Sequence, residues 1–351
     1  MPGEGVSVSK NVLENKFFRL ELDGEGRMVS LLHKATGRET LKAPSNTMHL
    51  FEDPAKDRLS AWDSYMEYTN KETVIPCESV QVVENTPQRG AVRLTWRFGK
   101  SVLTQDITIY SDTERIDFIT HADWQEDMRM LKAAFFPKVR ASRATYEIQF
   151  GAVERPTHRN TEYDAIRFEG SAHKWADLSQ GDFGLSILSD SKYGYDILDD
   201  RMRITLLRAP VEPDYKADRG EHDFIYSLYP HADSWDNGGT VKAGFALNVP
   251  ADLCEAETSG NAVPASFVAV EHPSVVLDTF KKAEDGKGYI LRLYETCGKG
   301  GEVKLQFAKA LKSVTAVSMM EENEGNVAFD GSSFTFETTP YCIHSYRVEF
   351  Q

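Results

Sequence analysis

The sequence predicts an almost entirely β protein built from antiparallel sandwiches, and three observations support this fold class. Apolar and polar residues alternate along many short runs, which places the apolar side chains on one face of a strand. Turn signals that contain glycine separate these runs. Stretches with helical spacing are nearly missing. Aromatic residues at 11% agree with this all-β prediction, since aromatic side chains cover half-buried sheets well.

The alternating runs recur from one end of the chain to the other. Phe18, Leu20 and Leu22, for example, are interleaved with charged residues. Residues 123–135 fit either a helix or a strand, and we interpret them as a strand because alternate positions from Arg129 to Phe135 share one face. The clearest runs are residues 18–22, 92–98, 116–118, 303–307 and 346–350, and the turn signals lie at residues 23–26, 238–239, 285–286 and 330–331.

A domain boundary is predicted near residues 250–265. Residues 248–250 end a predicted strand, and a small, polar segment follows at residues 257–264. About seven short strand-like runs come after it, which is the number that an immunoglobulin-like sandwich needs. We therefore predict a large, multi-stranded β domain over residues 1–262 and a smaller immunoglobulin-like β-sandwich over residues 263–351.

Charge and cysteine content exclude several classes of function. The net charge of −14 argues against nucleic acid and against anionic membranes as partners, because both need a basic surface. No stretch approaches the ~18 apolar residues of a membrane span. The four cysteines are widely spaced and form no Cys-x-x-Cys pair, and the first residues lack the features of a signal peptide. We therefore expect a reduced, cytoplasmic protein.

Metal-ligand and acid–base residues occur without a complete catalytic set. His-x-Asp appears at residues 121–123 and 231–233, but neither pair has a third ligand nearby, so no metal site is predicted. The densest ionisable cluster is residues 218–223. The two carboxyl groups of a glycosidase flank the sugar at about 5 Å or 6.5–9.5 Å, and neighbours on one loop rarely do so. We predict no catalytic residue in this chain.

Two polar segments favour contact with a hydroxyl-rich ligand. Residues 154–161 form a predicted loop in which His158, Arg159 and Asn160 supply hydrogen-bonding groups, although an ordinary polar loop explains them equally well. Aromatic residues lie beside carboxylates at residues 173–177 and 193–196. This pairing is typical of sugar binding, and aromatic side chains buried in a sheet are the alternative.

The order and spacing of several motifs resemble family 38 glycoside hydrolases, the α-mannosidases. The resemblance implies a galactose-mutarotase-like supersandwich over residues 12–255 and the family's terminal β domain over residues 266–351. The motifs are Glu-Arg-Ile-Asp-Phe at 114–118, Arg-Pro-Thr-His-Arg-Asn-Thr at 155–161, His-Lys-Trp-Ala-Asp-Leu-Ser at 173–179, Lys-Tyr-Gly-Tyr-Asp at 192–196, Leu-Leu-Arg-Ala-Pro at 206–210, Ala-Asp-Arg-Gly-Glu-His-Asp-Phe at 217–224 and Tyr-Pro-His at 229–231.

The resemblance also implies what the chain lacks. Family members carry the zinc ligands, the aspartate nucleophile and the acid/base carboxyl group on an amino-terminal half, and neither His-x-Asp pair of this chain has the setting of the family's zinc pair. The chain is thus similar to the carboxy-terminal region of a retaining, zinc-dependent α-mannosidase, and we expect it to be inactive alone and to hold no cofactor. Its expected partners are the amino-terminal catalytic domain of the same polypeptide and an α-mannoside, and a homo-oligomer stays open.

One candidate contact follows from the resemblance. An Arg-Gly pair of the family lies near the substrate, and Arg219-Gly220 matches it. We expect Arg219 to bind sugar hydroxyls, with Asp218 orienting it through a charge-assisted hydrogen bond. The alternative is that Arg219 forms a salt bridge at a domain interface.

Two other classes of function stay open at this point. One is a sugar epimerase of the mutarotase type, in which His158, His173 or His222 would pair with a glutamate. The other is a non-catalytic module that binds carbohydrate or another protein. Sandwich folds host many functions, so fold alone does not choose between them.

Overall fold

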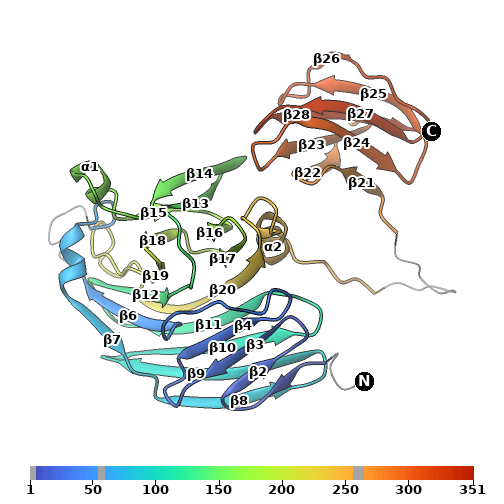
Figure 1. Ribbon diagram of the computed structural model, residues 1–351. Helices are drawn as coiled ribbons and strands as arrows, with labels where there is room; N and C mark the ends of the chain where they lie inside the picture. The colour runs from blue at the N-terminus through green and yellow to red at the C-terminus, as the bar shows by residue number, and fades with distance from the viewer. Residues whose placement is uncertain (1–4, 54–59, 256–264) are drawn as a thin grey trace. The chain divides into compact units, whose positions relative to one another are not determined.

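A computed structural model describes residues 5–53, 60–255 and 265–351 of the chain. The chain divides into two compact units, the first formed by residues up to 147 together with 153–250, and the second by residues 148–152 together with those from 251 onward. Nearly all regular structure in both units is β (Figure 1), which confirms the predicted fold class. The predicted domain boundary at residues 262/263 lies outside the described residues.

The first unit contains a five-stranded, a nine-stranded and a six-stranded sheet (Figure 1). The five-stranded sheet has the order β1 (Ser7–Val8), β2 (Val12–Glu14), β3 (Phe18–Leu22), β4 (Met28–His33) and β5 (Arg38–Glu39). The nine-stranded sheet has the order β14 (Gly151–Pro156), β13 (Arg143–Ile148), β16 (Trp175–Gln180), β17 (Phe183–Ser189), β20 (Gly220–Ala232), β11 (Ile116–Trp124), β10 (Ser101–Tyr110), β9 (Arg89–Phe98) and β8 (Ser79–Asn85). The six-stranded sheet has the order β15 (Gly170–Ser171), β18 (Gly194–Leu198), β19 (Arg201–Leu207), β12 (Arg129–Phe135), β6 (Thr47–Glu52) and β7 (Glu72–Ile75).

The alternating runs form strands where the sequence predicts them. In β3, for example, Phe18, Leu20 and Leu22 are buried while the residues between them are partly exposed. The ambiguous residues 123–135 are strand at both ends, since β11 ends at Trp124 and β12 begins at Arg129. A short connection separates these two strands, which belong to different sheets.

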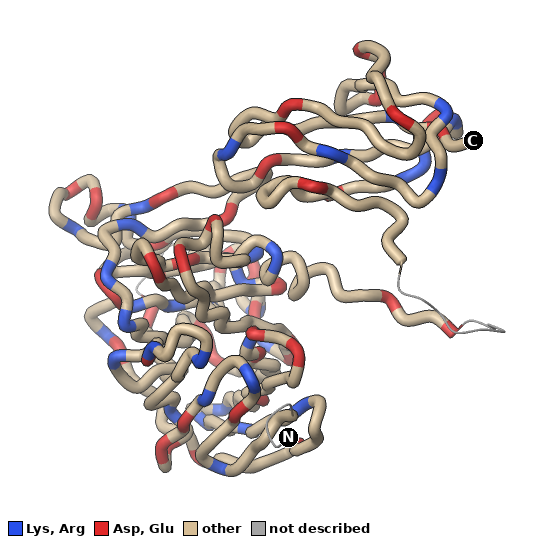
Figure 2. Tube along the Cα trace, turned by 45° about the vertical axis from the view of Figure 1, so that its right-hand side comes forward, with Lys and Arg blue, Asp and Glu red and all other residues tan. Residues whose placement is uncertain are grey.

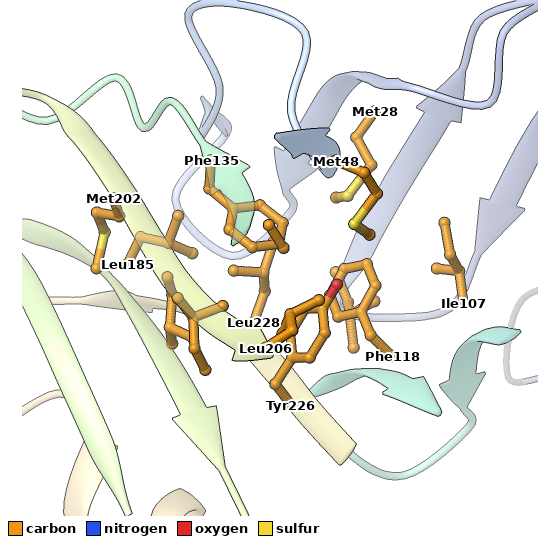
Figure 3. Close-up of a cluster of buried hydrophobic side chains, with 14 of the residues drawn as sticks. Met28, Met48, Ile107, Phe118, Phe135, Leu185, Met202, Leu206, Tyr226 and Leu228 are labelled. Carbon is orange, nitrogen blue, oxygen red and sulfur yellow. The ribbon is translucent and has the colours of Figure 1, made fainter. Parts of the chain in front are cut away.

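One apolar core joins the three sheets of the first unit (Figure 3). At its centre the rings of Phe118 and Tyr226 stack, with centroids 4.9 Å apart, because the two residues are directly opposite each other on β11 and β20. The Tyr226 hydroxyl is satisfied inside the core, where it accepts from Gln105 Nε2 (2.7 Å) and donates to Asn46 Oδ1 (3.1 Å). Buried polar groups need such partners, so these two hydrogen bonds allow the Tyr226 hydroxyl to lie inside the apolar core.

Among the described residues the helices are few and short: η1 (Met66–Asn70), α1 (Glu162–Ala165) and α2 (Thr240–Asn248). The prediction that residues 248–250 end a strand is wrong, because Asn248 is the last residue of α2 and residues 249–250 follow this helix. Gly239 precedes this helix with φ at 89°, a backbone conformation that glycine adopts at little cost. Gly244 lets α2 pack closely, since a Cβ there would lie 2.9 Å from Trp175 Cδ1. The two glycines at 238–239 therefore begin a helix instead of joining two strands.

The second unit is a two-sheet sandwich. Its core is a separate apolar cluster that includes Leu291, Leu305 and Val348. Alternation again selects the buried residues, as in β24, where Val303, Leu305 and Phe307 face inward. One sheet has the order β21 (Val268–Glu271), β24 (Gly301–Phe307) and β27 (Ser333–Thr338), and the other β22 (Val275–Lys282), β23 (Tyr289–Glu295), β28 (Ile343–Phe350), β25 (Leu311–Val317) and β26 (Asn323–Asn326).

Candidate functional site

The site residues predicted from sequence lie at opposite ends of β19. Before this strand, the N–H of Asp199 donates to the carbonyl of Thr157, the neighbour of His158. After it, the N–H of Ala209 donates to the carboxylate of Asp218. The seven residues of β19 span about 23 Å at the usual rise of a strand. The structure therefore does not bring the 158–160 loop and Arg219 into one site.

Arg219 lies on a rim that we define as residues 125–128 and 208–219. Its Nε donates to Asp127 Oδ1 at 2.7 Å, and its Nη2 contacts the second carboxylate oxygen. The Arg219 guanidinium lowers the pKa of Asp127 by hydrogen bonding and by its charge, so this carboxyl is ionised at neutral pH. Both side chains stay more than one-third exposed. Arg219 is thus oriented by a carboxylate while its side chain stays partly exposed.

The expectation that Asp218 orients Arg219 is wrong. Asp218 Oδ2 instead accepts from two backbone N–H groups, those of Arg208 (3.2 Å) and Ala209 (2.7 Å). Ala209 has φ at 54°, which a side chain other than glycine adopts only when its surroundings hold it. Its carbonyl accepts from the N–H of Met128, at 2.8 Å. Asp218 therefore stabilises the backbone of the rim, and Asp127 takes the orienting role.

A second arginine supports the rim from within. Arg208 Nε donates to the buried carboxylate of Asp53 at 2.9 Å. The Ser60 hydroxyl accepts from the N–H groups of Val211 (3.1 Å) and Glu212 (3.0 Å), which ties the segment that begins at Ser60 to the rim. Trp62 and Tyr215 belong to these tied segments and are 65% and 67% exposed. Exposed aromatic rings near a guanidinium are the groups that bind sugars by stacking and hydrogen bonding.

Of the other predicted residues, His158 lines a cleft of about 480 Å³ that we call the His158 cleft. Its polar lining comes from Arg143, Glu154, Arg155, His158, Asp164 and Arg167. His158 also lines a neighbouring cleft of about 650 Å³, together with Lys138, Arg140 and Asp199 among others. Arg159 is half-buried and Asn160 is exposed, and they line neither of these two clefts.

The two His-x-Asp pairs do not form a zinc site. His231 Nε2 lies 2.8 Å from Asp177 Oδ2 in the interior, and His121 Nδ1 lies 2.8 Å from Asp223 Oδ1 at the surface. In neither case does the aspartate two residues on take part. Across the described ranges, no three His, Cys, Asp or Glu residues gather closely enough to hold a metal ion. These residues therefore do not fit the zinc that the family resemblance implies.

Charged residues of both signs are interspersed along the trace (Figure 2), so net charge alone locates neither the rim nor the cleft. Asp127 was not predicted as a site residue. We interpreted residues 123–135 as one strand, whereas Asp127 lies in the connection between β11 and β12. Arg155 and Arg167 were also not predicted as members of one cleft. Their proximity depends on a short helix, α1, that the alternating pattern does not indicate.

Comparison with known proteins places this fold among the carboxy-terminal regions of glycoside hydrolases. The structure resembles that of a protein in glycosyl hydrolase family 38 from Enterococcus faecalis, with a TM-score of 0.80 and 14% identity over 98% of this chain and 44% of the other. An α-mannosidase from E. faecalis V583 gives a TM-score of 0.79 at 15% identity, over 98% of this chain and 43% of that one. At such identities the likeness concerns the fold alone.

Sequence comparison identifies the family. Residues 13–216 match the glycosyl hydrolases family 38 C-terminal domain, and residues 274–346 match the family's C-terminal beta sandwich domain. The chain is 34% identical to α-mannosidase G of Dictyostelium discoideum over 96% of its length, and 34% identical to human α-mannosidase 2C1 over 97%. It covers 32% and 34% of those two proteins. The chain belongs to glycoside hydrolase family 38 and corresponds to the carboxy-terminal region of its α-mannosidases.

The predicted family is therefore confirmed. The chain spans about a third of the length of the curated relatives it matches. Within the described residues, no helix combines the length and apolar character that a membrane crossing needs.

Proposed function

We propose that the chain is the carboxy-terminal β portion of a retaining, zinc-dependent α-mannosidase that cleaves terminal α-mannosides in the cytoplasm. In this proposal the chain forms one wall of the substrate cleft and an interface with the catalytic domain, and it is inactive alone. The observation that carries the proposal is the family match over both units, in a chain that spans about a third of its relatives.

The chemistry of the whole enzyme would come from residues outside the described part of this chain. Zinc would orient the mannose hydroxyls, and two carboxyl groups would act as nucleophile and as acid/base. The contribution of this chain is positional. Arg219 presents a fixed guanidinium with a free face, and Asp127 keeps that guanidinium from folding onto other acceptors. A guanidinium held in this way donates to sugar hydroxyls at a low entropic cost.

Assay of the chain alone with a nitrophenyl α-mannoside, with and without added zinc, tests its inactivity. We expect no release of nitrophenol above the uncatalysed rate. Turnover that depends on the protein would overturn the proposal that the chain lacks the catalytic groups. Faster interconversion of glucose or galactose anomers would favour a mutarotase-type epimerase instead.

Calorimetric titration with mannobiose tests the contact by Arg219. We expect weak binding that the substitution Arg219→Gln lowers at least fivefold. Arg97→Gln is the matched control, because Arg97 is another exposed arginine of the first unit and is paired with a carboxylate, that of Glu78. Equal loss in both variants, or no binding by the unmodified chain, would contradict a substrate contact at Arg219.

A further inference from the structure

We propose that the His158 cleft binds a phosphate group carried by a small organic molecule. The cleft lies on the edge strand β14 and the short helix α1, at the opposite end of β19 from Arg219. Nothing in the mannosidase proposal uses it, and it stands on a separate set of contacts.

Arg155 is held in this cleft, and no carboxylate of the described ranges pairs with it. Its guanidinium lies over the ring of Tyr146, 5.6 Å from the centroid, and its Cδ is close to Gly170, where an added Cβ would lie 3.5 Å away. The Nε atom is buried and lacks a hydrogen-bond partner among the described residues. Packing against an aromatic ring therefore fixes the position of the charge, and an acceptor for it is missing.

Arg167 supplies a second cation that is not paired with a carboxylate in the described part of the chain. Its guanidinium stacks on the ring of Tyr163 at 4.0 Å, and its Nη2 donates to the Tyr163 hydroxyl. The nearby carboxylate of Asp164 is engaged elsewhere. Asp164 Oδ2 accepts from the backbone N–H of Thr161 (3.2 Å) and from its hydroxyl (2.9 Å), which closes the capping box of α1.

The remaining polar groups leave the cleft with a surplus of donors. Glu154 Oε2 accepts from Arg143 Nε at 2.7 Å, so these two charges offset each other. His158 Nδ1 is buried and is 3.7 Å from Asp164 Oδ2, beyond hydrogen-bond distance. Arg155, Arg167 and His158 thus line a shared space, and neither arginine is paired with a carboxylate in the described part of the chain. The lining holds three arginines and two carboxylates, so it carries a local net charge of +1 in a chain with a net charge of −14.

The size and hydrogen-bonding groups of the cleft favour phosphate over carboxylate. A phosphate monoester has three acceptor oxygens and a carboxylate has two, so phosphate can accept from two arginines and an imidazole at once. The volume of about 480 Å³ exceeds what phosphate alone requires and is in the range of small-ligand sites. The ligand is therefore a phosphorylated molecule about the size of a sugar.

Calorimetric titration of the full chain with four probes tests the proposal: mannose 6-phosphate, mannose, inorganic phosphate and acetate. We expect mannose 6-phosphate and inorganic phosphate to bind, with affinities that fall as sodium chloride is raised. Acetate should bind at least tenfold more weakly than inorganic phosphate. Stronger binding of acetate would assign the cleft to a carboxylate and overturn the proposal, as would the absence of phosphate binding.

Two substitutions locate the binding. Arg155→Gln and Arg167→Gln should each weaken phosphate binding at least tenfold, and Arg97→Gln should leave it unchanged. Arg167 is exposed, so its replacement is not expected to unfold the protein, and the thermal midpoint of each variant checks this. Phosphate binding that survives both substitutions would contradict the proposal. Arg219→Gln separates the two sites, because it should lower mannobiose binding and leave phosphate binding intact.

Discussion

His231 Nε2 lies 2.8 Å from Asp177 Oδ2, and both side chains are 1% exposed. Asp177 also accepts from the hydroxyl of Ser186 at 2.7 Å, and Ser186 in turn contacts the Thr240 hydroxyl at 2.8 Å. This network joins β16, β17 and β20 to the first residue of α2. His231, which was considered as a metal ligand from the sequence, is therefore a buried structural residue that pairs with Asp177.

The pair should make the stability of the first unit depend on pH. Burial lowers the pKa of His231, but the charge and hydrogen bond of Asp177 outweigh it and raise the pKa above its ordinary value. A raised pKa means that the folded state holds the proton more tightly. The stabilisation is therefore complete below about pH 6.5, the pKa of an unfolded histidine, and is lost as the pH rises through the raised pKa.

Substitution His231→Gln tests this dependence. We expect a loss of about 3 kcal/mol near pH 6, since Asp177 is left buried without a cationic partner, and a smaller loss at pH 9. Urea unfolding followed by tryptophan fluorescence measures it, because all five tryptophans belong to the first unit. A loss that grows between pH 6 and pH 9 would contradict the assignment.

A glycine beside this pair leads to a second prediction. A Cβ on Gly184 would lie 2.4 Å from His231 Cε1 and 2.5 Å from Ser179 Oγ, and both side chains are anchored on Asp177. Gly184→Ala should therefore destabilise the first unit by about 2 kcal/mol, the usual cost of overpacking a core. Gly181→Ala is the control, because nothing lies within 4 Å of a Cβ there. Equal stability of the two variants in urea would show that the ring can move aside.

Most strands could be predicted from the sequence, because a two-residue period is a local property of the chain. Phe18 and Leu20 face inward for the same reason that Val303 and Leu305 do. The helix α2 could not, since its packing depends on Gly244 meeting Trp175 of a strand far away in sequence.

The site was less accessible to prediction than the strands. The sequence indicates which residues are polar and fall in loops, and His158 and Arg219 do line a cleft and a rim. Their partners depend on contacts between distant segments. Asp127 and Arg219 are 92 residues apart, and the antiparallel pairing of β11 with β20 brings them together. A neighbouring carboxylate, that of Asp218, was the obvious partner by sequence and is not the partner in space.

A buried lysine leads to a third prediction. The Nζ atom of Lys132 donates to the Tyr68 hydroxyl at 3.0 Å, forms an ion pair with Glu169 and lies 3.8 Å from Asp196 Oδ2. Its side chain is fully buried. Lys132→Met should destabilise the first unit by about 3 kcal/mol, because Glu169 loses its cation, while Asp196 keeps its ion pairs with Arg201 and Arg203. Lys71→Met, which removes the exposed partner of Glu52, should leave the urea midpoint nearly unchanged.

The last prediction separates the roles of the two aspartates at the rim. Asp218→Ala leaves the N–H groups of Arg208 and Ala209 without their acceptor, so we expect the first unit to lose about 1–2 kcal/mol of unfolding free energy. Asp127→Ala removes an exposed ion pair and should barely change stability.

Sugar binding should respond in the opposite order. Without Asp127 the Arg219 side chain is no longer oriented, and the affinity for mannobiose should fall severalfold while the protein stays fully folded. Asp218→Asn keeps a side-chain oxygen that accepts from the Ala209 N–H, so it should recover most of the stability lost in Asp218→Ala. Urea unfolding measures the stability of these three variants, and calorimetry measures their affinity for mannobiose. If Asp127→Ala and Asp218→Ala change stability and affinity in parallel, the rim acts as one rigid element and Asp127 has no separate orienting role.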